Sequence, residues 1–456
     1  MANTYLTRTT GTPTLGTKFT VSTWVKISEI PAGGGGDRWI FGEYGDSNNH
    51  SYLYLRNSSA IGWYEKDGGS SVISRITNKI CRDTNAWYHL MIAIDTTDST
   101  AEDRFKLYIN GERQTDWGTS SGTYSSSATP RLNSNNQPFS VGGTASYGSN
   151  FVGSMSHMHF CDGTALAPTV FGSTDSVTGE WFINTSPSFT VGNNGFTILK
   201  DGDTITDQSS NSNNFSLGGG TLTKTEDCPS NVFATWNVLD SHYFWGAEES
   251  SWCTNGNTTA RSGNSQYSSC TATLGASKGK YYWEFKYVAK SGSQNLWHLG
   301  IKSTQDTTST NALGEGATDY SYKAYNGQQM NNGSSSAYGS TYAVGDIIGI
   351  AMDLDNNKLY FHKNGTYLNS GVPTSGSTGT GAISIADAST TAFGFYVPAF
   401  SWNDGSSYGT NSVNFGNGYF GTTAVSSAGT NASGVGIFEY DVPAGYTALS
   451  TKGLNL

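Results

Sequence analysis

Apolar and polar residues alternate along most of this chain of 456 residues, with the period of two that is typical of half-buried β-strands. The clearest pattern occurs twice, in residues 87–113 and 344–368. In each copy an alternating strand ends at Asp95 or Asp353, and a second strand runs into Asn-Gly at 110–111 or 364–365. Asn-Gly favours the tight hairpin turn that needs positive φ. Both stretches therefore predict β-hairpins, with the two aspartates as turn residues at strand ends.

The two hairpins are too far apart to be units of a solenoid, whose repeats run about 20–50 residues. They predict an all-β chain with two antiparallel β-sandwiches of jelly-roll type in tandem. We expect a first sandwich over residues 1–172, a connector over 173–235, a second sandwich over 236–425, and a C-terminal docking segment over 426–456. The connector contains a credible strand at 195–200, so it should pack on one of the sandwiches, and the sequence does not indicate which. The Ser/Thr/Asn-rich stretch 118–136 predicts an outer loop with almost nothing to bury.

Composition excludes several classes of protein. Charged residues are only 13% of the chain while aromatic residues reach 13%, which argues against disorder. The net charge of −10 comes without a basic stripe, so nucleic acid is not an expected partner. The longest apolar runs, such as 347–352, are far shorter than a membrane helix, and the amino terminus has no apolar signal core. We therefore expect no membrane insertion and synthesis in a cytoplasm.

Five cysteines occur without CxxC pairs or metal-ligand spacing. Free, buried thiols are the favoured interpretation, and a bridge between Cys253 and Cys270 stays open.

The first block resembles laminin G-like domains of the concanavalin A-like lectin class. The resemblance rests on four stretches in order: residues 19–25, 87–90, 107–111, and 151–160 followed by 163–166. The second block resembles a SPRY domain, another concanavalin A-like sandwich. Its opening strand matches at 280–285, its most recognisable strand at 344–355, and the following hairpin at 359–365.

The whole arrangement resembles structural proteins of marine tailed bacteriophages. The matching segments are the opening at 5–9, the Asp-x-Ser-x-Asn-x-Asn-Asn-Phe tract at 207–215, and the Val-Pro-x-Gly-Tyr-x-Ala-Leu segment at 442–449. This resemblance implies a virion protein, in a fibre, a tail appendage or the capsid surface, that recognises a host-surface glycan or protein without covalent chemistry. Other virion proteins would be its partners, and it would form a homo-oligomer. The alternative is a purely architectural decoration protein that binds neighbouring virion subunits. A glycan depolymerase is the least favoured reading.

The chain is not expected to be an enzyme. Glycoside hydrolysis needs two carboxylates on one sheet face, which acidic residues at alternate strand positions would supply. Glu284 has no acidic neighbour two residues away, and Asp353 with Asp355 lies at a turn.

No cofactor is expected, although calcium is a weak alternative. The stretch 353–364 lacks the Gly and Glu of an EF-hand loop. Laminin G-like domains sometimes hold Ca²⁺ at a sheet rim, which makes Asp95, Asp98 and Asp103 weak candidates. His157, His159 and Met155 alternate on one strand and should share a face, but no third metal ligand is evident.

Sugar binding is the remaining chemistry. Sugars stack their apolar faces on aromatic rings, so aromatic residues in polar loops are candidates, with loop packing or subunit contact as the alternative. The candidates are Trp117, Tyr124 and Tyr147 in the first block and Tyr320, Tyr322, Tyr325, Tyr338, Trp402 and Tyr408 in the second.

Overall fold

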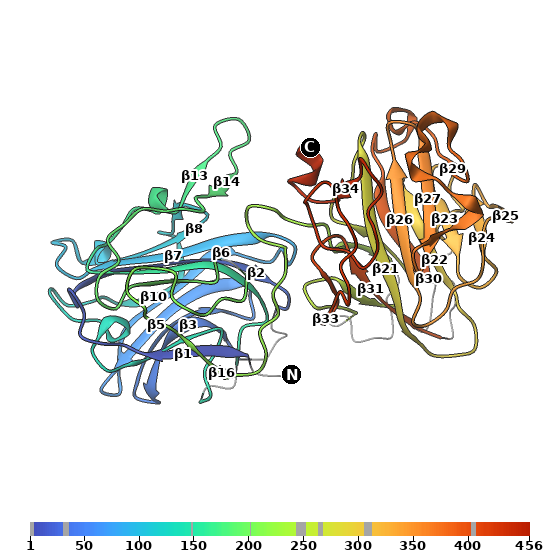
Figure 1. The fold of residues 1–456 in the computed structure, drawn as a ribbon. Coiled ribbons are helices and arrows are strands. Elements are labelled where there is room, and N and C mark those ends of the chain that lie inside the picture. The colour runs from blue at the N-terminus through green and yellow to red at the C-terminus, as the bar shows by residue number, and fades with distance from the viewer. Residues whose placement is uncertain are drawn as a thin grey trace. The chain divides into compact units, whose positions relative to one another are not determined.

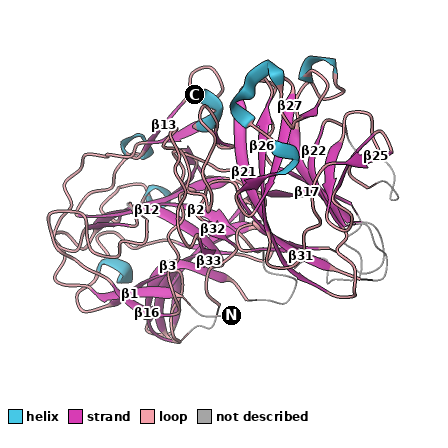
Figure 2. Cartoon of the chain, turned by 45° about the vertical axis from the view of Figure 1, so that its right-hand side comes forward, coloured by secondary structure: helices cyan, strands magenta, loops and turns pink. Residues whose placement is uncertain are grey.

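The computed structural model describes residues 4–30, 36–146, 149–200, 202–242, 252–262, 268–304, 312–402 and 407–456. Two compact units are present, one of residues 1–224 with 228–230 and one of 225–227 with 231–456. The regular structure is almost entirely strand, and the described helices are short 3-10 turns (Figure 2). The predicted all-β architecture with tandem antiparallel sandwiches is confirmed.

The first unit is a sandwich of an eight-stranded and a six-stranded sheet, with a small hairpin that projects from it (Figure 1). The eight-stranded sheet has the order β10 (Trp117–Gly122), β6 (Ser70–Ile80), β5 (Ala60–Asp67), β4 (Asn49–Leu55), β3 (Arg38–Asp46), β11 (Pro138–Val141), β1 (Tyr5–Thr9), β16 (Ser216–Gly219). The six-stranded sheet has the order β15 (Phe196–Ile198), β12 (Gly153–Asp162), β2 (Lys18–Ile27), β7 (Trp87–Asp95), β8 (Phe105–Ile109), β9 (Glu112–Arg113). The projecting hairpin pairs β13 (Gly172–Thr174) with β14 (Trp181–Ile183).

The second unit packs a seven-stranded sheet on a nine-stranded one. The seven-stranded order is β17 (Trp236–His242), β20 (Ser268–Ala272), β30 (Val397–Trp402), β22 (Trp297–Lys302), β23 (Tyr320–Lys323), β24 (Gln328–Asn331), β25 (Ser334–Ala337). The other sheet runs β18 (Cys253–Thr254), β19 (Thr259–Arg261), β31 (Gly409–Asn414), β21 (Lys280–Lys290), β26 (Ile347–Asp353), β27 (Lys358–Lys363), β28 (Thr366–Tyr367), with β29 (Ile383–Ser384) beside β27 and β34 (Thr447–Ala448) beside β21. A last hairpin joins β32 (Tyr419–Phe420) to β33 (Thr423–Ala424).

The 3-10 helices are η1 (Ala101–Asp103), η2 (Arg131–Asn133), η3 (Pro168–Val170), η4 (Leu368–Ser370), η5 (Pro373–Thr378), η6 (Ala388–Thr390) and η7 (Gly453–Asn455). Within the described ranges, no helix has both the length and the apolar character needed to cross a membrane. All five cysteines are free thiols, including Cys253 and Cys270.

The repeated hairpins form as the sequence predicts. Strand β7 pairs with β8 and β26 with β27, both antiparallel. The Asn-Gly pairs close the next hairpins along the chain, β8 with β9 and β27 with β28. Asn110 and Gly111 have φ of 50° and 76°, and Asn364 and Gly365 have φ of 47° and 83°. Positive φ at both central positions is what a type I′ turn demands, and Asn-Gly meets that demand at low cost.

The connector packs on the first sandwich. Strand β15 pairs with β12 and β16 pairs with β1, so residues 173–224 extend both sheets of the first unit. Asp207 accepts hydrogen bonds from the backbone N–H groups of Thr197, Ser209 and Asn213 at 2.8–2.9 Å. Phe215, at the end of the same tract, is 5% exposed in the core. The tract 207–215 is therefore a hydrogen-bonded loop that fastens the connector strands.

The C-terminal segment packs on the second sandwich through one buried carboxylate. Glu284 on β21 is fully buried, and it accepts hydrogen bonds from the N–H groups of Glu439 and Tyr440, both at 2.8 Å. The hydroxyl of Tyr282 and the amide of Asn414 also donate to it, at 3.0 and 3.4 Å. Burial raises the pKa of Glu284 to about 7, against the lowering effect of these four donors.

Two local expectations are wrong. Stretch 118–136 is not an outer loop with nothing to bury, because it contains most of β10 and places Tyr124 and Leu132 in the core with 1% and 0% exposure. A β-bulge also interrupts β12, where His157 and Met158 both lie opposite Thr23. The rings of His157 and His159 lie together, 6.5 Å between centroids, as expected. The extra residue shifts the alternation for Met155, which packs on the core while the ring of His159 stacks on Phe171 of the outer face.

We expect Glu284→Ala to release the C-terminal segment, because the N–H groups of Glu439 and Tyr440 and the hydroxyl of Tyr282 would lose their shared acceptor. The free energy of unfolding should fall by roughly 2–4 kcal/mol, and amide hydrogen exchange should accelerate across residues 437–449. Glu315→Ala, at an exposed glutamate of the same unit, is the control. Unchanged exchange in residues 437–449 of Glu284→Ala would contradict this role.

Candidate recognition face of the first unit

The first sandwich has two outer faces, and its own chain covers one of them. On the six-stranded sheet, Met91 and Ala93 are buried under Phe171, with Leu166 and Phe189 packed around them. This part of the face is therefore unavailable to a ligand.

Trp181 of the projecting hairpin also lies on this face, held by His89. The indole Nε1 of Trp181 donates to Nδ1 of His89 at 3.1 Å, and Nε2 of His89 lies 2.8 Å from the hydroxyl of Ser22. Because an indole can only donate, Nε2 of His89 carries the proton. Burial lowers the pKa of His89 to about 3, so the ring stays neutral above that pH.

The outer face of the eight-stranded sheet carries a row of aromatic rings on β3, β4 and β5. Trp39, Tyr52 and Tyr54 form its buried part, with Trp39 stacked on Tyr52 at 4.6 Å between centroids. Gly62 makes room for the ring of Tyr54, because a Cβ atom there would lie 2.1 Å from Cζ of that ring. The row is thus part of the sheet's own packing and is held rigidly.

The other end of this row is formed by Tyr44 and Tyr64 around the buried ring of His50, and we call it the Tyr-His-Tyr face. The rings of Tyr44 and His50 stack with an interplanar angle of 14° and 5.6 Å between centroids. His50 lies 5.6 Å from Tyr64, tilted by 36°. Tyr44 and Tyr64 are both partly exposed. Flat, partly exposed rings beside polar groups are the surface on which the apolar face of a sugar packs.

Polar groups border this face at the turn between β3 and β4. The carboxylate of Asp46 accepts from the N–H of Asn48 at 2.7 Å and from the side-chain amide of Asn49 at 3.0 Å. Those bonds lower the pKa of Asp46. Nδ1 of His50 lies 3.0 Å from the carbonyl oxygen of Asp46. An ionised carboxylate and amides therefore stand next to the rings, where sugar hydroxyls could bind.

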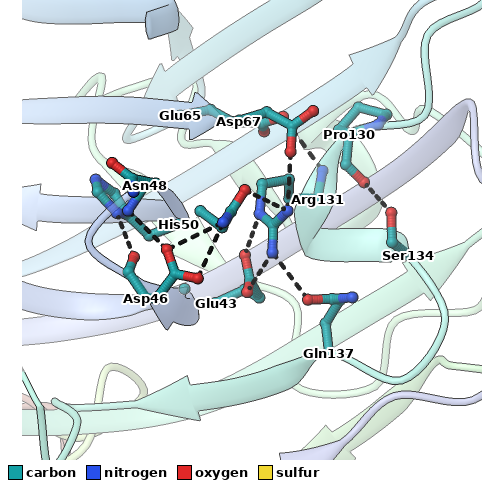
Figure 3. Close-up of polar contacts among 12 residues, drawn as sticks. Glu43, Asp46, Asn48, His50, Glu65, Asp67, Pro130, Arg131, Ser134 and Gln137 are labelled. Atoms are coloured by element: carbon teal, nitrogen blue, oxygen red, sulfur yellow. Dashed lines mark hydrogen bonds and ion pairs between the residues drawn. The ribbon is translucent and has the colours of Figure 1, made fainter. Parts of the chain in front are cut away.

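On the core side of the same strands, Arg131 of η2 is the centre of a charged cluster (Figure 3). Its guanidinium donates twice to the buried carboxylate of Glu43, at 2.9 and 3.0 Å, and once to Asp67 at 2.9 Å. It also reaches Gln137 at 3.0 Å and Asn49 at 3.5 Å. A two-pronged guanidinium–carboxylate pair is strong and directional. The cluster therefore fixes the ends of β3 and β5 and the turn that borders the Tyr-His-Tyr face.

Glu65 of β5 is the second buried carboxylate of this cluster. It accepts from the hydroxyl of Tyr124 at 2.7 Å and from the backbone N–H of Arg131 at 3.2 Å. Trp63 donates in turn to the hydroxyl of Tyr124 at 3.1 Å. Burial raises the pKa of Glu65 to about 7, because two hydrogen bonds do not replace the lost water.

Glu43 and Glu65 are two carboxylates on one face of a sheet, the arrangement that glycoside hydrolysis needs and that the sequence did not reveal. Both lie opposite Ser51 in the register of β3, β4 and β5, about 10 Å apart along the sheet. Both are buried, however, and Arg131 binds the two of them. In this geometry the two carboxylates hold Arg131 in place between the strands.

Five of the aromatic residues predicted to bind ligand are buried. Tyr124, Tyr320, Tyr322, Tyr338 and Trp402 are 1%, 6%, 0%, 5% and 0% exposed. They lie on strands or directly beside them rather than on free loops, and their polar atoms are used internally. The hydroxyl of Tyr320 accepts from the N–H of Ala386 at 2.9 Å, for example. The prediction is wrong for these five, because none offers a ring face to solvent.

The other candidates differ. Tyr325 is 42% exposed, and the ammonium of Lys323 lies 5.4 Å from its ring. Tyr408 is partly exposed, with the guanidinium of Arg261 stacked 3.9 Å above it. Trp117 is partly buried against the core. Tyr147 lies outside the described residues.

The weak calcium candidates are not brought together around one centre. Asp95 pairs with Lys18 at 2.8 Å, the carboxylate of Asp98 faces Lys106 at 3.9 Å, and Asp103 pairs with Arg113. Each carboxylate is thus neutralised by its own base. Among the residues with described positions, no group of three His, Cys, Asp or Glu is arranged to hold a metal ion.

The Tyr-His-Tyr face was missed because its residues lie on strands, not on polar loops. A signal was present in the sequence, since His50, Tyr52 and Tyr54 alternate along one strand and therefore share a face. Three aromatic residues at alternate positions predict a continuous aromatic surface.

Comparison with known proteins agrees with this architecture. Residues 2–170 match the laminin G model of the concanavalin A-like lectin/glucanases superfamily. Residues 280–411 match the SPRY domain. The chain therefore carries a laminin G-like, concanavalin A-type domain followed by a SPRY domain.

Similarity to curated proteins is confined to a short stretch. Ran-binding protein 9 of Danio rerio is 31% identical over 96 residues, which is 21% of this chain and 16% of that protein. The E3 ubiquitin-protein ligase RKP of Arabidopsis thaliana is 32% identical over 142 residues, 30% of this chain and 10% of that protein. The chain thus spans less than a fifth of the length of either relative.

Similar solved structures include the SPRY domain of human HERC1, with a TM-score of 0.29 and 16% identity over 39% of this chain and 96% of that one. The SAP-like pentraxin of Limulus polyphemus has a TM-score of 0.28 and 15% identity, covering 43% of this chain and 89% of that one.

We expect Glu65→Gln to remove a pH dependence of stability. The pKa of Glu65 rises on folding, so the folded state favours the protonated carboxyl group. The contribution of Glu65 to the free energy of unfolding is therefore fully present below about pH 4.5 and is lost as the pH rises through 7. The variant should therefore gain up to about 3 kcal/mol in free energy of unfolding, relative to the unchanged protein, between pH 5 and pH 8. Urea titrations at both pH values measure this, with Glu112→Gln on the surface as control. An identical difference at the two pH values would contradict the raised pKa.

Proposed function

We propose that this chain is a non-catalytic recognition protein on the surface of a tailed-phage virion, and that its first unit binds host glycan on the Tyr-His-Tyr face. The observation that carries the proposal is this face itself, where two partly exposed tyrosines flank His50 beside the carboxylate and amides of residues 46–49. A single such face binds sugar weakly. Many copies on one particle would gain effective affinity through multivalency.

The non-catalytic part of the proposal is supported by the use made of buried carboxylates. Glu43, Glu65 and Glu284 have the burial that a catalytic acid needs, but each is hydrogen-bonded to its own fold. The virion part is supported by the resemblance of the segment order, from the opening strand through the 207–215 tract to the 442–449 segment.

A purely architectural role is the second candidate, and the projecting hairpin favours it. Val177 at the hairpin tip is 90% exposed, and Phe182 on β14 is 44% exposed. Exposed apolar side chains on a protruding element suit contact with a neighbouring virion subunit.

Alanine substitution of the exposed rings tests the glycan proposal. On an array of bacterial lipopolysaccharide and capsular glycans, we expect Tyr44→Ala and Tyr64→Ala each to weaken binding about fivefold to tenfold, because a stacking surface is lost. Glu315→Ala, at an exposed residue of the second unit, should bind like the unchanged chain. Absence of binding to every glycan, or equal binding by all variants, would contradict the proposal.

The position of the chain on the particle tests the virion proposal. Gold-labelled antibody against the chain should mark intact particles of the encoding phage in electron micrographs. For the architectural role, Val177→Asp with Phe182→Ser should abolish incorporation into particles while glycan binding by the free chain persists. Unlabelled particles would exclude both virion roles, and normal incorporation of the double variant would exclude the hairpin as the attachment.

A further inference from the structure

The second unit has an open pocket of about 350 Å³ on the outer face of its seven-stranded sheet, where β17, β20 and the start of β30 meet. Its apolar wall is made by Leu274, Phe393, Phe395 and Val397. The two phenylalanine rings stack with 5.5 Å between centroids and an angle of 25°, and Phe395 is 40% exposed. The pocket therefore presents aromatic surface that the fold does not bury.

The absence of a side chain at Gly275 brings this wall close to the sheet. A Cβ atom at Gly275 would lie 2.7 Å from both Phe395 and Val397. The aromatic pair is thus seated directly against β20 and the loop that follows it, and its position is defined by backbone contact.

Among the described residues that line the pocket, Asp240 supplies the only charge, with Asn237 beside it. Its Oδ2 accepts from the hydroxyl of Thr271 at 2.5 Å. Within the described part of the chain, no Lys, Arg or His forms an ion pair with Asp240. Among the described residues, the hydroxyl of Thr271 is the one hydrogen-bond donor to Asp240, and it uses only Oδ2.

We propose that this pocket binds the side chain of an arginine presented by a partner protein. A guanidinium stacks on aromatic rings and donates to carboxylates, so it uses both features of the pocket at once. The net charge of −10 of the chain favours the approach of a basic partner. A sugar hydroxyl would donate to Asp240 without balancing its charge, and a purely apolar side chain would bury that charge. This site is separate from the Tyr-His-Tyr face and does not depend on glycan binding.

Peptide titration of the full chain tests the proposal. Saturation-transfer NMR with acetyl-Gly-Arg-Gly-amide should show binding in the millimolar range, and the peptide with citrulline, which keeps the shape but loses the charge, should bind at least fivefold more weakly. Asp240→Asn should weaken arginine binding by a similar factor while keeping an oxygen for Thr271, and Phe393→Leu should weaken it through the lost ring. Glu315→Gln, at an exposed acid of the same unit, should leave binding unchanged.

Three results would overturn the assignment. Equal affinity for the arginine and citrulline peptides, or no effect of Asp240→Asn in a variant that melts at the normal temperature, would remove the role of the carboxylate. Equal affinity for acetyl-Gly-Lys-Gly-amide would show that the pocket recognises only positive charge, and that the phenylalanine rings do not favour the planar guanidinium.

Discussion

Hydrogen bonding of buried carboxylates to backbone N–H groups is the interaction on which both units depend. Sandwiches without long helices must attach long irregular segments, whose buried backbone groups need partners. Asp162 accepts from the N–H groups of Thr14 and Asn194 and from the amide of Asn133, and so joins three distant segments. Asp207 does the same within the connector, and Glu284 fixes the C-terminal segment. In a chain with few charged residues, these acidic side chains mainly hold irregular segments against the sandwiches.

The strand plan was predictable from sequence because it depends on local rules. Alternation defined both hairpins, and Asn-Gly defined the tight turn after the second strand of each, where the positive φ values of Asn110 and Asn364 confirm the reason. The bulge at His157 was not predictable, since an inserted residue changes which side chains share a face without changing the composition of the strand. The partner of the connector was equally hidden, because it is chosen by long-range contacts such as those of Asp162.

The candidate sites were predicted less well, for a physical reason. Tyrosine and tryptophan serve both as core residues and as ligand surfaces, and the sequence around Tyr322 or Trp402 is polar in either case. Whether the hydroxyl or indole finds an internal acceptor decides the outcome, as for Trp402, which donates to the carbonyl of Ser407 at 2.9 Å. The Tyr-His-Tyr face is formed by three consecutive strands and was overlooked, whereas the Asp240 pocket became visible only when strands distant in sequence were placed side by side.

The 207–215 tract completes the core of the first sandwich, and this limits where genes that encode this domain can recombine. Phe215 stacks edge-on against Phe196 and Phe139, so the hydrophobic interior is completed only near residue 215. Recombination at residue 170, where the laminin G-like match ends, would produce one chain in which these rings are exposed to water. The exchangeable module is therefore longer than the recognisable family domain, and a viable chimera must inherit the asparagine-rich tract together with the sandwich it completes.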